Sequence, residues 1–245
     1  IREETNKLRQ KYRNVLINIH VAETKAEVEE YITKYGMSPI RYLDAIGFLE
    51  NDTLCVHCVW SNDEDLKILS QKNVSVVHNP SSNLKLGSGI APVKKMLQKN
   101  INVVLGTDGA ASNNRLDMLW EMRLTALLHK GVNIDPKALP APMVLEMTTK
   151  NASKALGLDS EIGSIEVGKY ADLVFIDLNR VLQATPFHDI YSLIIYSLDL
   201  RAIWGVMVNG RMIYENGEFK TIRDIDKVKS KVIDIRMRIE EELYH

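Results

Sequence analysis

Histidine and acidic side chains occur just after, or at the end of, successive apolar runs in the first half of the sequence. The set consists of His20, Glu23, His57, His78 and Asp108. Imidazole and carboxylate groups are ligands that zinc or iron(II) takes in a catalytic site with an open position for water. One such residue alone is more often structural, because Asp108-Gly109 can simply form a turn and Glu23 can complement a helix N-terminus. The interpretation as a catalytic metal site therefore depends on all five reaching one rim.

The elements that must position these residues alternate between β-type and helical patterns. Apolar β-type runs occupy residues 15–21, 53–60, 74–78 and 101–106, and helical spacing follows in residues 25–35, 63–72, 90–99 and 115–129. Serial β-α units predict a parallel sheet with helices outside it. In a barrel built of such units, functional groups lie at the carboxyl ends of the strands. The sequence thus predicts that the five side chains meet at one edge.

The second half of the sequence changes character. Residues 143–156 predict one more helix, which ends at Gly157. Residues 162–177 and 202–219 are rich in Val, Ile and Gly, and the pairs Asn209-Gly210 and Asn216-Gly217 are hairpin signals. An apolar residue recurs every three or four positions from Ile225 to Ile239, which predicts a C-terminal helix. We expect a small antiparallel module followed by that helix.

Other polar residues carry less specific signals. Cys55-Val56-His57-Cys58 could indicate a zinc or redox motif, but strand alternation points Cys58 away from His57 and there is no second cysteine pair. The polar loop residues Asn83, Ser112, Asn113 and Asn114 are explained by loop capping and are also placed to contact a polar substrate. The remaining histidines are assigned no role: His129, His188 and His245.

Composition excludes some partners. The 245 residues are 45% hydrophobic and 26% charged, with a formal net charge of -1 and no basic block. Nucleic acid and membrane surfaces are therefore not favoured partners. No apolar run approaches the roughly 20 residues of a membrane helix. The two cysteines argue against a disulfide scaffold and fit a reducing compartment, which we expect to be the cytoplasm.

Several segments resemble the 5′-methylthioadenosine/S-adenosylhomocysteine deaminases of the amidohydrolase superfamily, which include 5′-deoxyadenosine deaminases. These segments are His20-Val21-Ala22-Glu23-Thr24 and residues 56–60, 78–86 and 105–114. Residues 163–174 resemble the segment in which the superfamily's chain returns from the barrel to a small β-sandwich. The resemblance implies an α/β fold: the C-terminal half of a (β/α)8 TIM barrel, about strands 5 to 8, plus part of that sandwich and a C-terminal helix. The implied domains are a partial barrel (1–160), part of the sandwich (161–219) and the helix (220–245).

The resemblance also implies roles for individual residues. His20 and Asp108 match positions that bind one divalent metal, zinc or else iron. Glu23, His57 and Asp108 match catalytic positions: Glu23 protonates the substrate ring, His57 faces the attacking water and Asp108 takes its proton. Glu23, His78, Asp108 and Ser112 match substrate-binding positions. The implied reaction is hydrolytic deamination of S-adenosylhomocysteine, 5′-methylthioadenosine or 5′-deoxyadenosine to the inosine derivative and ammonia.

Two alternatives and one departure accompany this interpretation. The chain could be a guanine deaminase or triazine hydrolase type of enzyme, or a non-catalytic fragment. The family's first barrel strand supplies two further ligands as His-x-His, and this sequence has no His-x-His. We therefore expect these residues alone to be inactive and to need an N-terminal part of the same polypeptide. The other expected partners are a small nucleoside substrate and further copies in a homo-oligomer.

Overall fold

The computed structural model describes residues 2–12, 15–186, 188–222 and 224–244. They form two compact units, the first made of residues 1–169 and 181–200 and the second of residues 170–180 and 201–245. The domain ranges 1–160, 161–219 and 220–245 stay a prediction.

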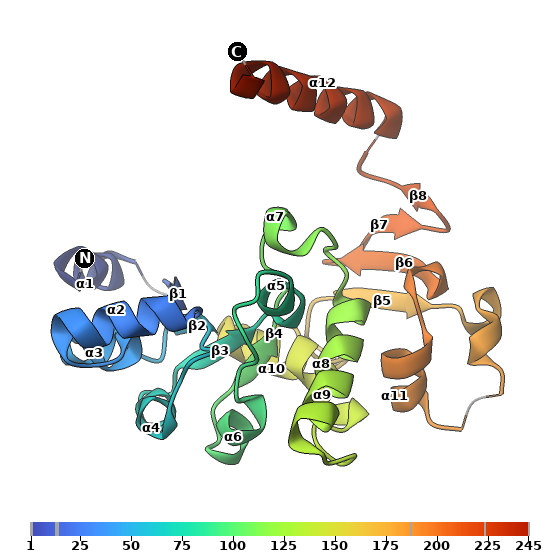
Figure 1. The fold of residues 1–245 in the computed structure, drawn as a ribbon. Helices are drawn as coiled ribbons and strands as arrows, with labels where there is room; N and C mark the ends of the chain where they lie inside the picture. Colours follow the sequence, from blue (N-terminus) through green and yellow to red (C-terminus); the bar gives the residue numbers. More distant parts are fainter. Residues whose placement is uncertain (1, 13–14, 187, 223, 245) are drawn as a thin grey trace. The chain divides into compact units, whose positions relative to one another are not determined.

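A four-stranded parallel sheet is the centre of the first unit (Figure 1). Its strands lie in chain order and are β1 (Ile17–Val21), β2 (Thr53–His57), β3 (Ser75–His78) and β4 (Val103–Leu105). The register pairs Val21 with His57 and His78 with Leu105, so the carboxyl ends of the strands are level with one another. The predicted parallel α/β sheet is confirmed.

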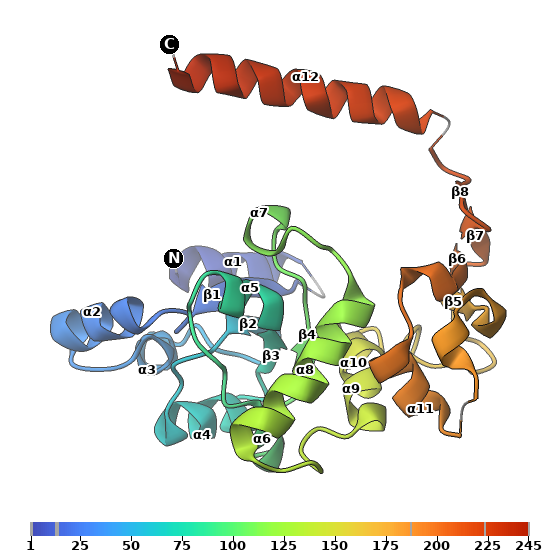
Figure 2. The same cartoon turned by 45° about the vertical axis from the view of Figure 1, so that its right-hand side comes forward.

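One helix precedes β1, and helices follow each strand of this unit. They are α1 (Arg2–Lys11), α2 (Lys25–Tyr35), α3 (Pro39–Ala45), α4 (Asp63–Gln71), α5 (Pro80–Lys85), α6 (Val93–Gln98), α7 (Ala110–Asn113), α8 (Met118–Asn133), α9 (Ala141–Thr148) and α10 (Lys150–Ala155). Shorter turns complete it: η2 (Leu182–Ala184), α11 (Ile190–Ser192), η3 (Leu193–Ser197) and the start of η4 (Leu200–Ala202). In Figures 1 and 2, α5 and α7 lie at one end of the sheet and α4 and α6 at the other.

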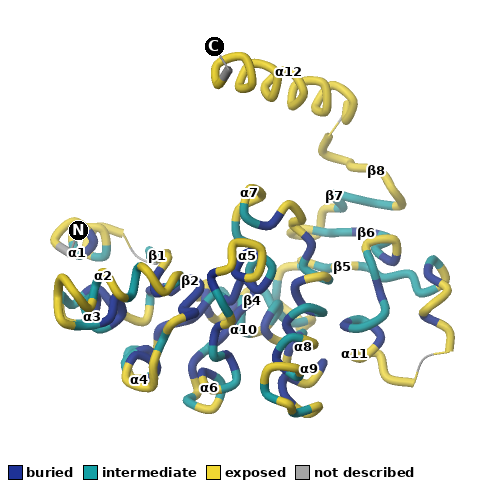
Figure 3. The backbone as a smooth tube through the Cα atoms, in the orientation of Figure 1, coloured by how far each residue is buried: buried dark blue, intermediate teal, exposed yellow. Residues whose placement is uncertain are grey.

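The core of the unit lies between the sheet and its helices. The strands contribute fully buried Cys55, Val76 and Val103, and the strand colours of Figure 3 show this burial. Leu66 of α4 and Met96 of α6 pack into the same cluster. Strands β2 to β4 are buried along most of their length, as in a parallel sheet covered on both faces. Strand β1 instead alternates, with Asn18 and His20 exposed.

Three expectations about local structure differ from the structure. The run 53–60 ends as a strand at His57, because His57 and Cys58 have φ of 72° and 48°, outside the β region. The segment 143–156 is two helices, α9 and α10, separated at Thr149 with φ −122° and ψ −93°. The short helices α3, α5 and α7 were not predicted, since each has too few residues to display a helical period.

The second unit contains an antiparallel sheet of four strands. These are β5 (Leu173–Ile176), β6 (Ile203–Val208), β7 (Arg211–Glu215) and β8 (Glu218–Phe219), and the turn η1 (Leu178–Arg180) also belongs here. Both Asn-Gly pairs form the predicted hairpins, and all four of their residues have positive φ, as a tight I′ turn requires. Of the β-type run 162–177, only residues 173–176 form a strand.

The unit ends in the predicted C-terminal helix, α12 (Ile225–Tyr244). No helix among the described residues is both long and apolar enough to span a bilayer.

Candidate active site

His20, His57 and Asp108 meet at the carboxyl end of the parallel sheet. One ligand atom of each lies within 4.8 Å of the others. His20 and His57 come from the ends of β1 and β2, and Asp108 follows β4. Parallel register levels these strand ends, so residues far apart in sequence converge. The predicted grouping of these three residues at one edge is therefore what the structure shows.

The imidazole of His57 is fully buried and asymmetric in its contacts. Its Nδ1 lies 2.8 Å from the side-chain oxygen of Asn83. Because an amide oxygen only accepts hydrogen bonds, Nδ1 carries the hydrogen and Nε2 is left with a lone pair. That Nε2 is buried and has no hydrogen-bond partner among the described residues. The ring stacks on His20 with centroids 5.3 Å apart.

An unpartnered buried imidazole nitrogen fits a metal site. A buried polar atom without a partner is costly, and a cation or a water molecule beside one would satisfy it. His20 and Asp108 add nitrogen and oxygen donors within reach, which is a donor set suited to zinc or iron(II).

The carboxyl group of Asp108 is held by three donors. Oδ2 accepts from Ser82 Oγ at 2.6 Å and from Ser112 Oγ at 2.9 Å, and Oδ1 accepts from the Gly109 amide at 2.8 Å. Burial raises the pKa of Asp108, but these hydrogen bonds outweigh it, so the pKa lies below its ordinary value. Asp108 is therefore ionised at neutral pH, as a metal ligand must be.

Glu23 faces the same histidine. Its Oε2 lies 3.6 Å from His57 Nε2, and Asp108 Oδ2 lies 4.0 Å from that nitrogen. Ser88 Oγ donates to Glu23 Oε1 at 3.1 Å. The backbone before α2 is itself fixed, since the Ala22 and Glu23 amides both donate to the carboxyl group of Glu27. Two carboxyl groups thus flank one imidazole.

His78 lies outside the cluster formed by His20, Glu23, His57 and Asp108. The side chain is fully buried, and its Nε2 lies 3.2 Å from Nε2 of His129 on α8. Burial, and then the neighbouring His129 and His57, lower the pKa of His78 well below its ordinary value. A role for His78 in substrate binding stays a prediction. His129, to which the sequence assigned no role, is its partner.

Sequence reasoning missed some residues that hold the site. Ser82 and Ser88 contact the two carboxyl groups, yet a single serine outside a motif carries no signal. Asn83 and Asn113 were noted only as polar loop residues, and Ser112 also as a substrate-binding position, which stays a prediction. A buried polar stripe on α8 at residues 121, 125 and 129 could have indicated a partner for such loops, because residues four apart share a helix face.

The cysteines near His57 are structural. Cys55 and Cys58 are buried and unbridged. Hydrogen bonding with Cys55 and burial raise the pKa of the Cys58 thiol well above its ordinary value. A protonated buried thiol is neither a good metal ligand nor a good nucleophile.

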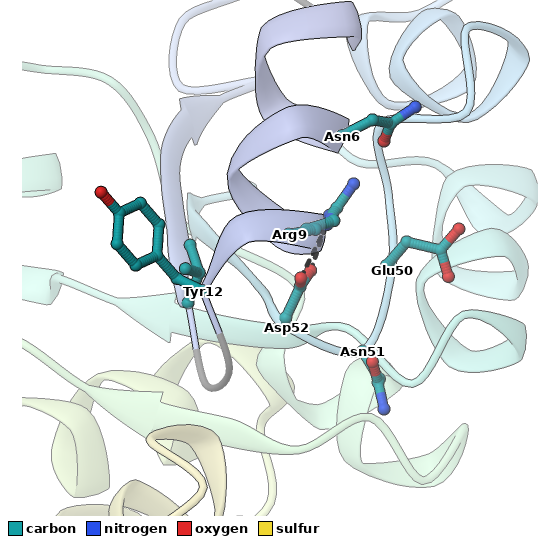
Figure 4. A pocket seen from close by; sticks show the side chains of 7 residues that line it. Asn6, Arg9, Tyr12, Glu50, Asn51 and Asp52 are labelled. Carbon is teal, nitrogen blue, oxygen red and sulfur yellow. Dashed lines mark hydrogen bonds and ion pairs between the residues drawn. The ribbon is translucent and has the colours of Figure 1, made fainter.

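An open depression lies near the start of β2, away from the strands' carboxyl ends (Figure 4). It is lined by Asn6, Arg9, Tyr12, Val15, Glu50, Asn51 and Asp52. Both Asp52 oxygens accept from Arg9 at 2.6 Å, and Arg9 also donates to the Phe48 carbonyl at 3.0 Å. These internal contacts tie α1 to the loop before β2, which is a structural role.

A parallel α/β sheet with imidazole and carboxyl groups at its carboxyl edge is an arrangement that metal-dependent hydrolases use. Residues 4–213 match the Amidohydrolase family. The chain belongs to this family.

Curated and solved relatives agree with that assignment. The chain is 48% identical to a 5-methylthioadenosine/S-adenosylhomocysteine deaminase of Thermoanaerobacter pseudethanolicus over 219 residues. This alignment covers 89% of this chain and 50% of the relative. An adenosine deaminase from Xanthomonas campestris with bound zinc superposes with a TM-score of 0.92 at 34% identity, over 98% of this chain and 55% of that one. The zinc complex of atrazine chlorohydrolase from Arthrobacter aurescens gives a TM-score of 0.85 at 25% identity, over 94% and 50%. The chain spans about half the length of the curated relatives it matches.

Proposed function

We propose that the protein is a metal-dependent hydrolytic deaminase of an adenosine derivative. The substrate is S-adenosylhomocysteine, 5′-methylthioadenosine or 5′-deoxyadenosine, and the products are the inosine derivative and ammonia. One observation carries the proposal: the unpartnered Nε2 of buried His57 faces Glu23 at 3.6 Å and Asp108 at 4.0 Å. The name and identity of the Thermoanaerobacter relative support the substrate class.

The residues divide the proton transfers between them. Asp108, held by Ser82, Ser112 and Gly109, accepts a proton from the attacking water. Glu23 donates a proton to the ring nitrogen next to the carbon under attack, and His57 Nε2 accepts a hydrogen bond from the entering oxygen. The carbon–oxygen bond forms and the bond to the amino group breaks. The amino group leaves as ammonia with the proton that Asp108 took from water, and the remaining hydroxyl proton returns to Glu23, which leaves the ring carbonyl of the inosine derivative. His20 and Asp108 would hold the metal, zinc most of all, which when bound lowers the pKa of water.

The surrounding assembly is part of the proposal. Two observations support a half-barrel of strands 5 to 8. Among the described residues the outer strands β1 and β4 each pair on one side only, and the match covers about half of the relative's length. Further metal ligands would then come from the other half of the same polypeptide. We also infer a homo-oligomer and, from two unbridged cysteines, the cytoplasm.

The competing chemistry is hydrolysis of an amino- or chloro-substituted heterocycle other than adenine. It is favoured by the fold similarity to atrazine chlorohydrolase. Ammonia release by the full-length gene product from the three adenosine derivatives, guanine and a triazine separates the two. Turnover of a triazine or guanine with none of the adenosine derivatives would replace the proposed substrate class.

The Glu23→Gln variant tests the mechanism. Gln has the shape of Glu but cannot donate the acid proton, so kcat should fall by roughly 10²- to 10⁴-fold with an unchanged melting temperature. Glu29→Gln is the matched control, because Glu29 is an exposed residue of the adjoining helix α2 that pairs with Lys25 on the same helix. A Glu23→Gln variant as active as this control would refute the role of Glu23.

A further inference from the structure

Helix α8 carries three buried polar residues on one face. Glu121, Thr125 and His129 are spaced by four residues, and each is at most 1% exposed. A buried carboxyl group is costly unless it is hydrogen-bonded, so the contacts of Glu121 need an explanation.

The two oxygens of Glu121 accept from two different segments. Oε2 accepts from the backbone amide of Ser81 at 3.2 Å, and Oε1 accepts from the side-chain amide of Asn113 at 2.8 Å. Ser81 lies at the start of α5 and Asn113 at the end of α7. The side-chain amide of Asn113 also donates to the carbonyl of Thr107 at 2.6 Å, next to Asp108.

The residues that hold the site are neighbours of these anchor points. Ser82 and Asn83 follow Ser81, and they contact Asp108 Oδ2 and His57 Nδ1 respectively. Ser112 precedes Asn113 and donates to the same Asp108 oxygen. Glu121 therefore connects α5 and α7, the two helices whose side chains set the position of Asp108. Helix α5 also sets the tautomer of His57 through Asn83.

We propose that Glu121 is a positioning residue of the active site, acting through α5 and α7 on Asp108 and His57. This inference rests on the proposed deaminase function. Glu121 is fully buried with both oxygens engaged, so it touches neither substrate nor metal. Partners that orient metal ligands in this way commonly change metal affinity or activity by 10- to 100-fold when they are replaced.

Glu121→Gln is the informative substitution because it keeps the shape and changes one acceptor into a donor. In either orientation the new NH2 group faces an existing donor, the Ser81 amide or the Asn113 amide, so one of the two ties is lost. Thr125→Val is the matched control. Thr125 is equally buried one turn along the same face, and its hydroxyl has no hydrogen-bond partner among the described residues.

The experiment measures three quantities on the full-length gene product: Zn²⁺ affinity by competition with a chelator, kcat and KM with 5′-methylthioadenosine, and the melting temperature. For Glu121→Gln we expect zinc affinity and kcat to fall by roughly 10- to 100-fold, with KM changed less than kcat. Thr125→Val should match the wild type in all three. Wild-type zinc affinity and kcat in Glu121→Gln would overturn the proposal.

A second variant covers the case in which Glu121→Gln folds poorly. Asn113→Ala removes the tie between α7 and Glu121, together with the Asn113 contacts to the Thr107 carbonyl and the Arg115 amide, and should also lower zinc affinity. Combined with Glu121→Gln, its effect should be smaller than the sum of the two single losses, because both act through one network. Fully additive losses would refute the shared network. A wild-type protein that binds zinc but deaminates none of the substrates would refute the proposed function. It would leave the proposal for Glu121 testable, because the zinc affinities of the variants can still be compared.

Discussion

The two ends of the parallel sheet are built in opposite ways. At the carboxyl end the backbone takes left-handed conformations at non-glycine residues: Ala22, His57, Cys58 and Asp108, with φ between 48° and 72°. Buried polar atoms there also lack partners among the described residues, including His57 Nε2 and His78 Nδ1. Near the amino end, Arg9 donates to Asp52, Thr53 and the Phe48 carbonyl.

This difference separates the residues that carry the chemistry from those that stabilise the fold. Left-handed residues and unpartnered buried atoms each cost on the order of 1 to 3 kcal/mol and persist only where the surroundings hold them. Asn73 and Asn100, before β3 and β4 at the amino end, also have positive φ, 53° and 58°, but asparagine adopts this region at little cost. The costly cases therefore concentrate at the carboxyl edge, as expected of a site that reserves its polar atoms for ligands. At the other edge, polar groups are satisfied internally and hold α1 on the sheet. Substitutions at the two ends should therefore have different consequences, of which four follow from the largest to the smallest.

Asp108→Asn should have the largest effect, and the effect should fall on metal binding and activity and not on stability. The amide is a poor metal ligand and cannot accept the proton from water, so zinc binding should be lost and kcat should fall by roughly 10³-fold. The melting temperature should be close to that of the wild type. Asp52→Asn is the control at the other end, which should keep zinc and activity and lose stability. Metal analysis, kinetics and calorimetry on both variants test this, and equal loss of activity in both would break the comparison.

The burial of His129, which contacts His78, makes the free energy of unfolding depend on pH. Burial lowers its pKa from 6.5 to about 4. Between those values the unfolded chain binds a proton that the folded protein does not, so stability is complete above pH 6.5 and falls as the pH falls towards 4. The loss attributable to this group is about 3 kcal/mol.

Urea unfolding at pH 7 and pH 4 measures this contribution. His129→Gln should reduce the difference between the two free energies of unfolding, whereas the exposed His188→Gln should leave it as in the wild type. The same pH dependence in all three proteins would contradict the assignment to His129.

Arg9→Met should destabilise the amino end without changing the chemistry. It removes the guanidinium donor from Asp52 and from the Phe48 carbonyl, which costs about 1.5 to 3 kcal/mol in the free energy of unfolding. Lys7→Met is a control, because Lys7 is exposed and pairs with the exposed Glu4. A fall in kcat at a temperature where Arg9→Met is folded would mean that the two ends are coupled.

Ser112→Ala should have the smallest effect at the carboxyl end. Asp108 keeps its hydrogen bonds from Ser82 and Gly109, so the loss should be one hydrogen bond of about 1 kcal/mol, or roughly a 5-fold fall in kcat/KM. Ser70→Ala in α4 removes a hydrogen bond to Lys99 elsewhere in the unit and should leave kcat/KM unchanged. A loss as large as that of Asp108→Asn would show that Ser112 contacts the substrate directly.

Local sequence determined much of the secondary structure. The helix predicted over residues 25–35 has those bounds as α2, because Thr24 caps its first turn and Gly36 ends it with φ 70°. The Asn-Gly hairpins and the four segments that form the parallel strands were also predictable, since turn chemistry and apolar runs are local signals. The grouping of His20, His57 and Asp108 was predictable too, because parallel strands bring their carboxyl ends to one edge.

Tertiary structure alone decided what each side chain does at that edge. His57 and His78 both end strands, yet His57 lies between Glu23 and Asp108 while His78 pairs with His129 from a helix 51 residues away. The tautomer of His57 is set by Asn83 and the position of Asp108 by Ser82 and Ser112, which lie in the short helices α5 and α7. Contacts of this kind depend on packing between distant segments, which the spacing of residues along a sequence does not encode.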